Sequence, residues 1–328
     1  MPDSLKETIL LTGAAGFIGW RTSELLFEAG YAVVGIDNMN DYYDVRLKEH
    51  RLDGLRKYPG FKFYRMDIED LSALEVVFKD NPIAAVINLA ARAGVRHSIE
   101  DPHVYLRTNA GGTLNLLEMM RKHDVRKMVL ASTSSIYAGE RPPFSEDLPV
   151  NTPISPYAAS KKAAEAMAYT YHHLFGLDIS VLRYFTVYGP AGRPDMSVLR
   201  FIKLIDEGKP IVVYGDGSQR RDFTYIDDIA EGTVKALMPV GYTIINLGGG
   251  KEPEQLNYLI SRMEEYLGKR AVIDRRPFER ADMTETRADI TRAWEILGWK
   301  PKISLDEGLK KTVLWYIANR DWLRDLRL

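Results

Sequence analysis

The sequence predicts an α/β protein in which a doubly wound parallel sheet is joined to a smaller C-terminal α/β lobe. Short β-branched runs alternate with amphipathic segments through the first half of the chain, which is typical of a parallel sheet with helices on both faces. A glycine-rich turn directly follows the first of these runs. Beyond about residue 186, Pro and Gly residues separate shorter elements, which indicates a second lobe.

Six runs in the first half have the length and composition of buried strands. They cover residues 8–12, 32–36, 61–65, 84–89, 127–131 and 178–183. Helical spacing is clearest in residues 104–121 and 157–175. Pro156 suits the first turn of the second helix, and Gly176 suits its C-terminal end.

Composition excludes several classes of protein. Forty-four Lys and Arg against 45 Asp and Glu leave a formal charge of -1 over 328 residues, which provides no basic field for nucleic acid or an anionic membrane. The chain has no Cys, and its six His lack metal-ligand spacing, so we expect no disulfide and no metal. No stretch approaches the roughly 18 apolar residues of a membrane span. We expect a cytoplasmic protein.

Gly13, Gly16 and Gly19 form a turn between the first strand and a helix. The N-terminus of such a helix offers free N–H groups to phosphate, and the missing side chains let a pyrophosphate approach. Asp37 ends the second strand, where its carboxylate would accept hydrogen bonds from ribose hydroxyls. It would repel a 2′-phosphate, and residues 38–40 offer no cation to offset it, so NAD is favoured over NADP.

These features predict a Rossmann-type NAD-binding domain over residues 1–185, with part of 220–240 returning to it. Residues 186–328 would form mainly the substrate-binding lobe. Asp67 and Ile68, at the end of the third strand, could hold adenine, although an Asp at this place can also cap a helix.

Tyr157 and Lys161 lie four residues apart on one face of the helix that follows the fifth strand. A Tyr and a Lys at this spacing also occur by chance. Their position directly after the fifth strand is therefore the reason to interpret them as catalytic. The strand ends in a run of Ser and Thr (132–135), at the edge where catalytic groups of open α/β sheets gather. Together with the positive nicotinamide, Lys161 would lower the pKa of Tyr157 and make it a general base, and Thr133 could share the proton.

In this order, the motifs resemble those of the extended short-chain dehydrogenase/reductases and, within that family, the nucleotide-sugar epimerases. The resemblance runs from about Thr8 to Trp315 and includes residues 88–91, 132–135, 183–190 and 221–228. It implies that the catalytic triad is Thr133, Tyr157 and Lys161. The NAD-binding residues expected are Gly13, Gly16, Phe17, Ile18, Gly19, Asp37, Asn38, Asn40, Asp67, Ile68, Leu89, Ala90, Ala91, Asn109, Ser132, Tyr157, Lys161 and Tyr184. The UDP-sugar-binding residues expected are Arg96, Thr133, Ser134, Ser135, Thr186, Arg193, Tyr214, Arg221, Arg280 and Asp282.

The residues after Thr133 distinguish the members of this family. Its dehydratases have an Asp-Glu pair there, and its UDP-glucuronate decarboxylases carry Glu where Ser135 stands. Thr186, where the UDP-glucose 4-epimerases usually have Asn, and the nearby Arg193 agree with a uronate substrate. The chain resembles the UDP-glucuronate 4-epimerases in particular over residues 37–48, 93–96 and 189–196.

The resemblance implies NAD-dependent C4 epimerisation of UDP-glucuronate to UDP-galacturonate through a transient 4-keto intermediate, with NAD bound tightly and regenerated in each cycle. Because that intermediate is a β-keto acid, we expect the hydroxyls of residues 133–135 and 186 to hold its carboxylate away from the alignment that releases carbon dioxide. The alternatives are a UDP-glucose or UDP-N-acetylglucosamine 4-epimerase, a UDP-glucuronate decarboxylase and a non-catalytic NAD-sensing protein. The family also pairs the helices 104–121 and 157–175 across a two-fold axis, which implies a homodimer with a four-helix bundle.

Overall fold

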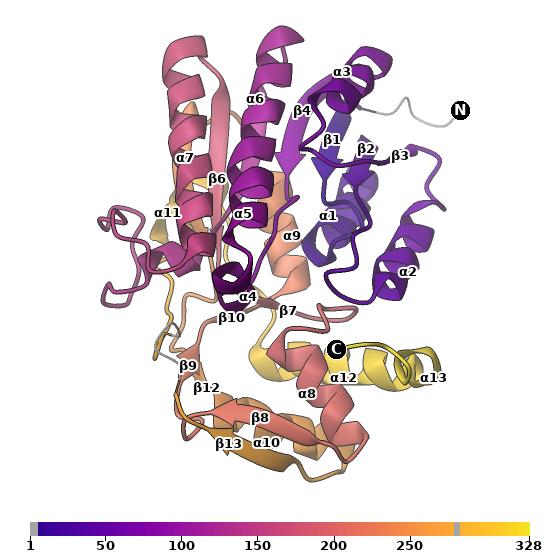
Figure 1. Cartoon of the computed structure of the whole chain (residues 1–328), viewed down its shortest axis with the longest axis vertical. Coiled ribbons are helices and arrows are strands. Elements are labelled where there is room, and N and C mark those ends of the chain that lie inside the picture. The colour runs from indigo at the N-terminus through magenta and orange to yellow at the C-terminus, as the bar shows by residue number, and fades with distance from the viewer. Residues whose placement is uncertain (1–5, 279–282) are drawn as a thin grey trace.

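The centre of the molecule is a seven-stranded parallel sheet in the order β11-β6-β5-β4-β1-β2-β3 (Figure 1). The computed structural model describes residues 6–278 and 283–328. All six strands predicted for the first half form, with ends shifted by at most two residues. The strands of this sheet are β1 (Thr8–Thr12), β2 (Ala32–Asp37), β3 (Phe61–Arg65), β4 (Ile83–Asn88), β5 (Lys127–Thr133), β6 (Asp178–Tyr184) and β11 (Tyr242–Leu247).

Helices cover both faces of the sheet, because successive strand residues point to opposite sides and nearly all are apolar. Leu10 faces one layer, which consists of α3 (Leu71–Asp80), α6 (Gly112–Lys122) and α7 (Pro156–Phe175). Ile9 and Leu11 face the other layer, which consists of α1 (Phe17–Glu28), α9 (Ile226–Lys235) and α11 (Thr291–Leu297). Over the described ranges, no helix has the length and hydropathy needed to cross a bilayer.

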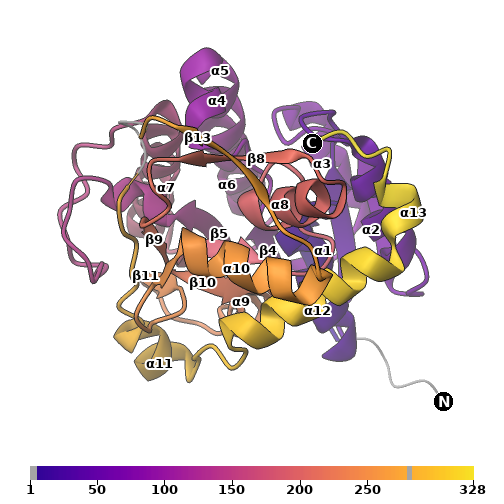
Figure 2. The same ribbon diagram turned by 90° about the horizontal axis from the view of Figure 1, so that it is seen from below.

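The C-terminal half contributes to two places. Its β11 is an edge strand of the large sheet, and its α9 and α11 pack on that sheet. Most of its remaining elements form a second lobe below the sheet, which faces the viewer in Figure 2. The core of this second lobe contains Ile202, Ile211, Leu259 and Leu309. Its elements are α8 (Ser197–Asp206), β8 (Pro210–Tyr214), α10 (Leu256–Leu267), β13 (Val272–Arg276), α12 (Leu305–Ala318) and α13 (Arg320–Leu323). Two further small sheets pair β7 (Thr186–Tyr188) with β10 (Phe223–Tyr225) and β9 (Arg220–Arg221) with β12 (Glu254–Gln255).

The single helix predicted over residues 104–121 is interrupted. After α4 (Val95–Glu100), the chain forms α5 (Pro102–Tyr105), a π-helical turn η1 (Leu106–Gly111) and then α6. A Cβ atom on Gly112 would lie 2.4 Å from Ile68 Cδ1, so the glycine lets the helix pack closely on the segment after β3. The π turn places an extra residue at this contact, which the spacing of apolar residues does not reveal.

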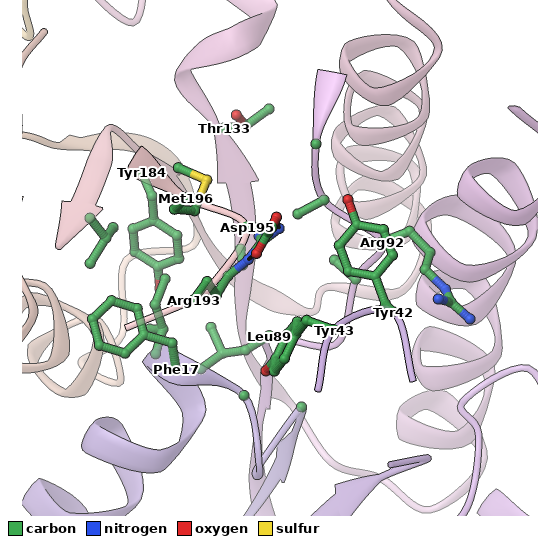
Figure 3. Close-up of a pocket in the computed structure, with 18 of the residues that line it drawn as sticks. Phe17, Tyr42, Tyr43, Leu89, Arg92, Thr133, Tyr184, Arg193, Asp195 and Met196 are labelled. Atoms are coloured by element: carbon green, nitrogen blue, oxygen red, sulfur yellow. Dashed lines mark hydrogen bonds and ion pairs between the residues drawn. The ribbon is translucent and has the colours of Figure 1, made fainter. Parts of the chain in front are cut away.

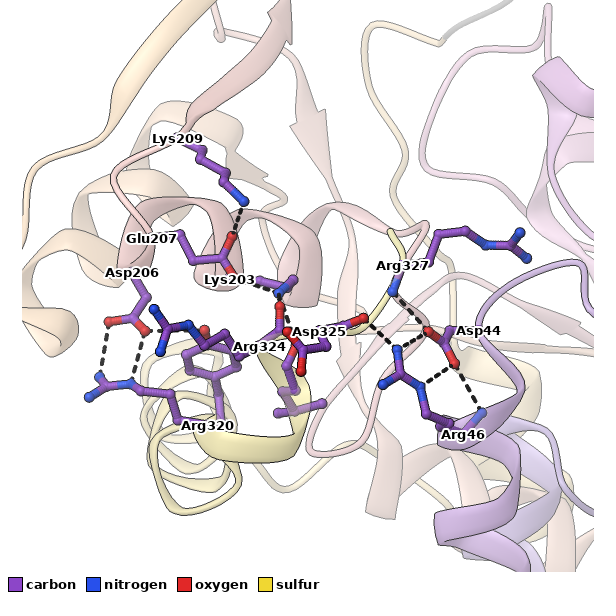
Figure 4. Close-up of polar contacts among 12 residues, drawn as sticks. Asp44, Arg46, Lys203, Asp206, Glu207, Lys209, Arg320, Arg324, Asp325 and Arg327 are labelled. Atoms are coloured by element: carbon purple, nitrogen blue, oxygen red, sulfur yellow. Dashed lines mark hydrogen bonds and ion pairs between the residues drawn. The ribbon is translucent and has the colours of Figure 1, made fainter.

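The C-terminal residues connect the two lobes (Figure 4). Asp44 caps α2 (Val45–Leu55) by accepting a hydrogen bond from the Arg46 backbone at 3.1 Å, and it also accepts one from the Arg327 backbone at 2.9 Å. In the second lobe, the buried Lys203 ammonium donates to backbone carbonyl groups at the end of α13, at 2.9 and 2.5 Å. The chain end therefore holds the start of α2 against α8.

Candidate active site

A cavity of about 690 Å³ lies at the carboxyl ends of the central strands, and Arg193, Asp195 and Met196 are among the residues that line it (Figure 3). It has the position expected of a dinucleotide site in an open α/β sheet. Most residues predicted for the cofactor and substrate line it: Gly13, Gly16, Phe17, Ile18, Gly19, Asp37, Asn38, Asn40, Asp67, Ile68, Leu89, Ala90, Ala91, Arg96, Ser132, Thr133, Ser134, Ser135, Tyr157, Lys161, Tyr184, Thr186 and Arg193.

The glycine turn has no room for side chains. Gly13 has a φ of 71°, and a Cβ atom on it would lie 2.9 Å from the Ala90 nitrogen. A Cβ atom on Gly19 would lie 2.1 Å from the Gly13 carbonyl oxygen. Helix α1 begins at Phe17 with no side-chain cap, so its first N–H groups are available to an anion in the cavity.

Asp37 ends β2 and is held in a fixed orientation. Its Oδ1 accepts a hydrogen bond from the Met39 backbone at 2.8 Å, and its Oδ2 accepts one from the Ala15 backbone at 3.2 Å. A cation from outside residues 38–40 lies beside this carboxylate, because Lys48 Nζ is 3.4 Å from Asp37 Oδ1. Residues 38–40 contain no cation, but the first turns of α2 bring Lys48 back to the end of β2.

The alternative role for Asp67, as the cap of a helix, is not the one that it has. Helix α3 is capped by Asp70, whose carboxylate accepts a hydrogen bond from the Ala73 backbone at 3.0 Å. Asp67 Oδ2 instead accepts a hydrogen bond from Asn38 Nδ2 at 2.6 Å, and Asn38 Oδ1 accepts one from the Asn40 backbone at 3.0 Å. This polar group lies at the cavity beside Asp37.

Tyr157, Thr133 and Lys161 meet where β5 ends and α7 begins. Burial raises the pKa of the Tyr157 phenol, while its interaction with the Thr133 hydroxyl lowers it. The predicted lowering of this pKa depends on Lys161 together with the positive nicotinamide and stays a prediction. The Lys161 ammonium donates a hydrogen bond to the Ala131 carbonyl at 2.9 Å. Burial lowers the pKa of Lys161 to about 8.

A buried ion pair fixes α7 on the sheet. Glu165, one turn beyond Lys161, accepts hydrogen bonds from Arg183 on β6 at 3.0 and 2.9 Å and from Ser132 on β5 at 2.6 Å. At the helix start, Ser155 Oγ accepts a hydrogen bond from the Ala158 backbone at 3.2 Å. Because both ends of this segment are anchored, the orientation of Tyr157 and Lys161 toward the cavity is set by the sheet.

A second cavity, of about 160 Å³, adjoins the first. Ser134, Ser135 and Thr186 line both cavities, and Arg221 lines only the smaller one. The described lining of the smaller cavity contains several hydroxyl groups and no carboxylate. Hydroxyl and guanidinium donors without an acid suit a bound carboxylate.

Two arginines, Arg193 and Arg96, line the cavity. Arg193 donates to both carboxylate oxygens of Asp195, at 3.0 and 2.5 Å, and its guanidinium lies 5.8 Å from the centre of the Tyr42 ring. Figure 3 labels these three residues. The Arg96 guanidinium lies 4.0 Å over the ring of Tyr214. Tyr214 does not itself line the cavity but supports Arg96 from the end of β8.

Three other predicted residues have different placements. Asn109 does not line the cavity. Its side chain bonds the backbone N–H and C=O of Arg92, at 2.8 and 3.0 Å, and donates to Ser160 Oγ at 2.9 Å, so it shapes the loop that forms one wall. Arg280 and Asp282 lie outside the described residues.

Several lining residues were missed by sequence reasoning, among them Tyr42, Tyr43, Lys48, Arg92 and His97. The first three lie in residues 37–48, one of the stretches that carried the resemblance to the epimerases. That stretch was therefore a usable signal, although it did not say which of its side chains face the cavity.

Comparison with known proteins agrees with this geometry. A model of the NAD dependent epimerase/dehydratase family matches residues 9–248. The chain belongs to this family. The predicted family and NAD dependence are thereby confirmed. The chain is also 59% identical over 319 residues to the UDP-glucuronate 4-epimerase of Thermodesulfobacterium geofontis, covering 97% of this chain and 99% of that protein.

Solved structures confirm the predicted fold. The UDP-glucuronic acid 4-epimerase of Bacillus cereus, in complex with UDP-glucuronic acid and NAD, superposes with a TM-score of 0.88 at 38% identity and covers 95% of this chain and 99% of its own. The UDP-glucose 4-epimerase of Thermotoga maritima, with UDP-glucose, gives a TM-score of 0.86 at 32% identity with the same coverage. The fold alone does not choose between the two sugars.

The residues of this chain fit NAD. The tight glycine turn, whose backbone packing leaves no room for side chains at Gly13 and Gly19, and the uncapped start of α1 suit the pyrophosphate. Asp37 is oriented for the adenosine ribose, and Asn38 with Asp67 lies beside it. When bound, NAD supplies the acceptor and the donor of a hydride.

Proposed function

We propose that the protein is an NAD-dependent UDP-glucuronate 4-epimerase, which interconverts UDP-glucuronate and UDP-galacturonate. The observation that carries the proposal is the position of Tyr157 in the larger cavity, which adjoins the smaller one. The described lining of the smaller cavity contains several hydroxyl groups and no carboxylate. The identity of 59%, over nearly the full length, to a UDP-glucuronate 4-epimerase supports the same substrate.

In the proposed reaction, Tyr157 removes the proton of the C4 hydroxyl as the C4 hydride leaves, and Thr133 shares that proton. The resulting 4-keto sugar turns its other face toward the same position, because one position cannot deliver a hydride to both faces of a fixed ring. Tyr157 then returns the proton to the C4 oxygen as the hydride returns to C4. Lys161 holds a positive charge beside this proton transfer as long as the pH lies below its pKa.

The uronate makes one demand that a neutral sugar does not. Its 4-keto intermediate is a β-keto acid, which loses carbon dioxide when the bond to the carboxylate aligns with the ketone π system. We propose that the hydroxyls of Ser134, Ser135 and Thr186 bind the carboxylate and hold this bond out of alignment. Thr133 belongs to the same set of hydroxyl groups. Its Oγ1 accepts a hydrogen bond from the Ser135 backbone at 3.1 Å.

We further propose that residues 1–185 bind NAD, with α9 and β11 completing their sheet, and that the remaining residues bind the UDP part. Arg96, Arg193 and Arg221 are the cations proposed for the nucleotide diphosphate and the uronate. Anchoring at the UDP end leaves the hexose ring free to turn, which the reaction requires.

We also propose a homodimer that pairs α6 and α7 with their copies. These two helices lie side by side on one face of the sheet (Figure 1). Met167 and Leu174, seven residues apart and hence on one face of α7, are 39% and 62% exposed. Light scattering should give the mass of two chains, and Leu174→Asp should give the mass of one.

The direct test is to incubate the purified protein, without added NAD, with UDP-glucuronate, UDP-glucose or UDP-N-acetylglucosamine and to follow the C4 epimer by proton NMR. We expect conversion of the uronate only. Conversion of a neutral sugar only would retain Tyr157 and the family but overturn the substrate. Conversion of none of them would overturn the epimerase assignment.

A further inference from the structure

Lys48, on α2, is a buried lysine in the wall of the cavity. Its ammonium is 3.4 Å from Asp37 Oδ1, and the two side chains are 6% and 7% exposed. Both residues line the cavity at the carboxyl end of β2. The pair is therefore almost fully removed from water in the protein itself, yet it faces the space proposed for the adenosine ribose.

The ammonium of Lys48 is poorly satisfied. It has three donors, and within the described part of the chain its one hydrogen bond is the long contact with Asp37. The ring of Tyr43 lies 5.4 Å from Nζ and adds a cation–π contact. A buried charge with unused donors costs free energy that a bound oxygen atom would recover.

The carboxylate of Asp37 is better satisfied and also keeps capacity for a ligand. Each of its oxygens accepts one backbone hydrogen bond, Oδ1 from Met39 and Oδ2 from Ala15. Oδ1 also accepts the long hydrogen bond from Lys48, and Oδ2 can accept a second bond from a ligand. Acceptor and donor thus lie side by side. This arrangement matches a hydroxyl group, which donates to the carboxylate and accepts from the ammonium.

We propose that Lys48 is a cofactor-binding residue that donates to a hydroxyl of the adenosine ribose, and that the Asp37–Lys48 pair sets the choice of NAD over NADP. Asp37 repels a 2′-phosphate. Lys48 attracts one, but the neighbouring Asp37 carboxylate cancels most of that attraction. Because the charges of Asp37 and Lys48 nearly cancel, removing the Asp37 carboxylate would leave a cation at this position and weaken the preference for NAD. The inference depends on the NAD dependence of the family and is independent of which sugar is the substrate.

Four variants test this proposal: Lys48→Met, Lys48→Arg, Asp37→Asn and the double variant Asp37→Asn/Lys48→Met. For each, the NAD retained by the purified protein and the dissociation constants of NAD and NADP are measured without any sugar. We expect Lys48→Met to weaken NAD binding about 10-fold, which is about 1.4 kcal/mol, and Lys48→Arg to restore most of it. We expect Asp37→Asn to strengthen NADP binding about 10-fold and the double variant to lose that gain.

Arg65→Met is the matched control. Arg65 is the β3 partner of Asp37 in the strand register but does not line the cavity, so its loss should leave both dissociation constants unchanged. The proposal is overturned if Lys48→Met binds NAD as the unmodified protein does, or if the double variant keeps the gain in NADP binding. A melting temperature of Lys48→Met without cofactor that matches the unmodified protein separates lost binding from lost folding.

Discussion

The side chain of Arg51 donates two hydrogen bonds to the carbonyl oxygen of Ala191, from Nε at 3.1 Å and from Nη2 at 2.7 Å. Arg51 lies on α2, and Ala191 lies in the loop that leads to Arg193. The guanidinium is fully buried and also donates to the Ala15 carbonyl at 3.1 Å and to the Tyr43 hydroxyl at 2.8 Å. One side chain thus joins the glycine turn to the loop that carries a proposed substrate residue.

Arg51→Met should therefore weaken both binding sites together. The substitution leaves several buried carbonyl groups without donors, and we expect a loss of about 3 kcal/mol or more in the free energy of unfolding, together with less retained NAD. Arg51→Lys keeps the positive charge but replaces only some of the guanidinium hydrogen bonds, so its stability and its retained NAD should lie between those of the unmodified protein and of Arg51→Met. Urea denaturation and the NAD content of the purified protein measure these effects. Arg56→Met, on the exposed side of the same helix, is the control and should change neither.

Tyr157→Phe should reduce kcat about 10²–10⁴-fold, because the phenol is the group that takes and returns the C4 proton. The NAD content should remain that of the unmodified protein, since the ring is kept. Tyr58→Phe preserves stacking on Phe27, at a ring distance of 4.3 Å, and provides a control outside the cavity. Epimerisation by Tyr157→Phe at more than about a tenth of the normal rate would remove Tyr157 from the proton transfer.

Removing hydroxyls from the proposed carboxylate group should release a UDP-pentose. In Ser135→Ala and Thr186→Val, the 4-keto uronate is held less firmly, so the bond to its carboxylate can align with the ketone and carbon dioxide can leave. Product analysis by NMR should show the pentose beside UDP-galacturonate. Thr170→Val, which removes a hydroxyl from the outer face of α7, should give no pentose. Slower variants with no by-product would mean that these hydroxyls do not control the carboxylate.

Activity should fall as the pH rises through about 8, because Lys161 then loses its charge. Burial lowers this pKa from 10.5, and Glu165 partly offsets the effect. Glu165→Gln should therefore move the alkaline limb of the kcat–pH profile to lower pH. Lys162→Met, which removes the more exposed partner of Glu165, should leave the limb in place. An unmoved limb in Glu165→Gln would show that Lys161 does not set it.

The lowered pKa of Lys161 affects stability in the opposite direction from activity. Between about pH 8 and 10.5 the unfolded chain binds more protons at Lys161 than the folded chain does, so the contribution of Lys161 to stability rises with pH. Loss of activity in this window is therefore not explained by unfolding through Lys161. Thermal denaturation across the same pH range distinguishes the two effects.

The sequence predicted those features that depend on local pattern. The central strands follow from β-branched runs, and the glycine turn, Asp37 and the Tyr157–Lys161 pair follow from the place of each residue relative to a strand end. The π turn before α6 was not predicted, because one extra residue in a helical turn barely changes the apolar spacing.

Lys48 and Arg51 show what a single sequence could not reveal. Both lie in α2, where a charged residue is ordinarily exposed to solvent. Their partners are Asp37 at the end of β2 and Ala191 in the second lobe, and only the folded chain brings them together. The hydrogen bond from Lys161 to the Ala131 carbonyl was also not predicted, because it depends on side-chain geometry.

The proposed reaction inverts C4 of UDP-glucuronate by removing and returning the same hydrogen at that carbon. The most direct test uses UDP-glucuronate labelled with deuterium at C4 and the protein as purified, with no NAD added. We predict UDP-galacturonate that keeps the deuterium at C4 in the NMR spectrum. Failure to form UDP-galacturonate, or UDP-galacturonate that carries hydrogen from water at C4, would contradict the account.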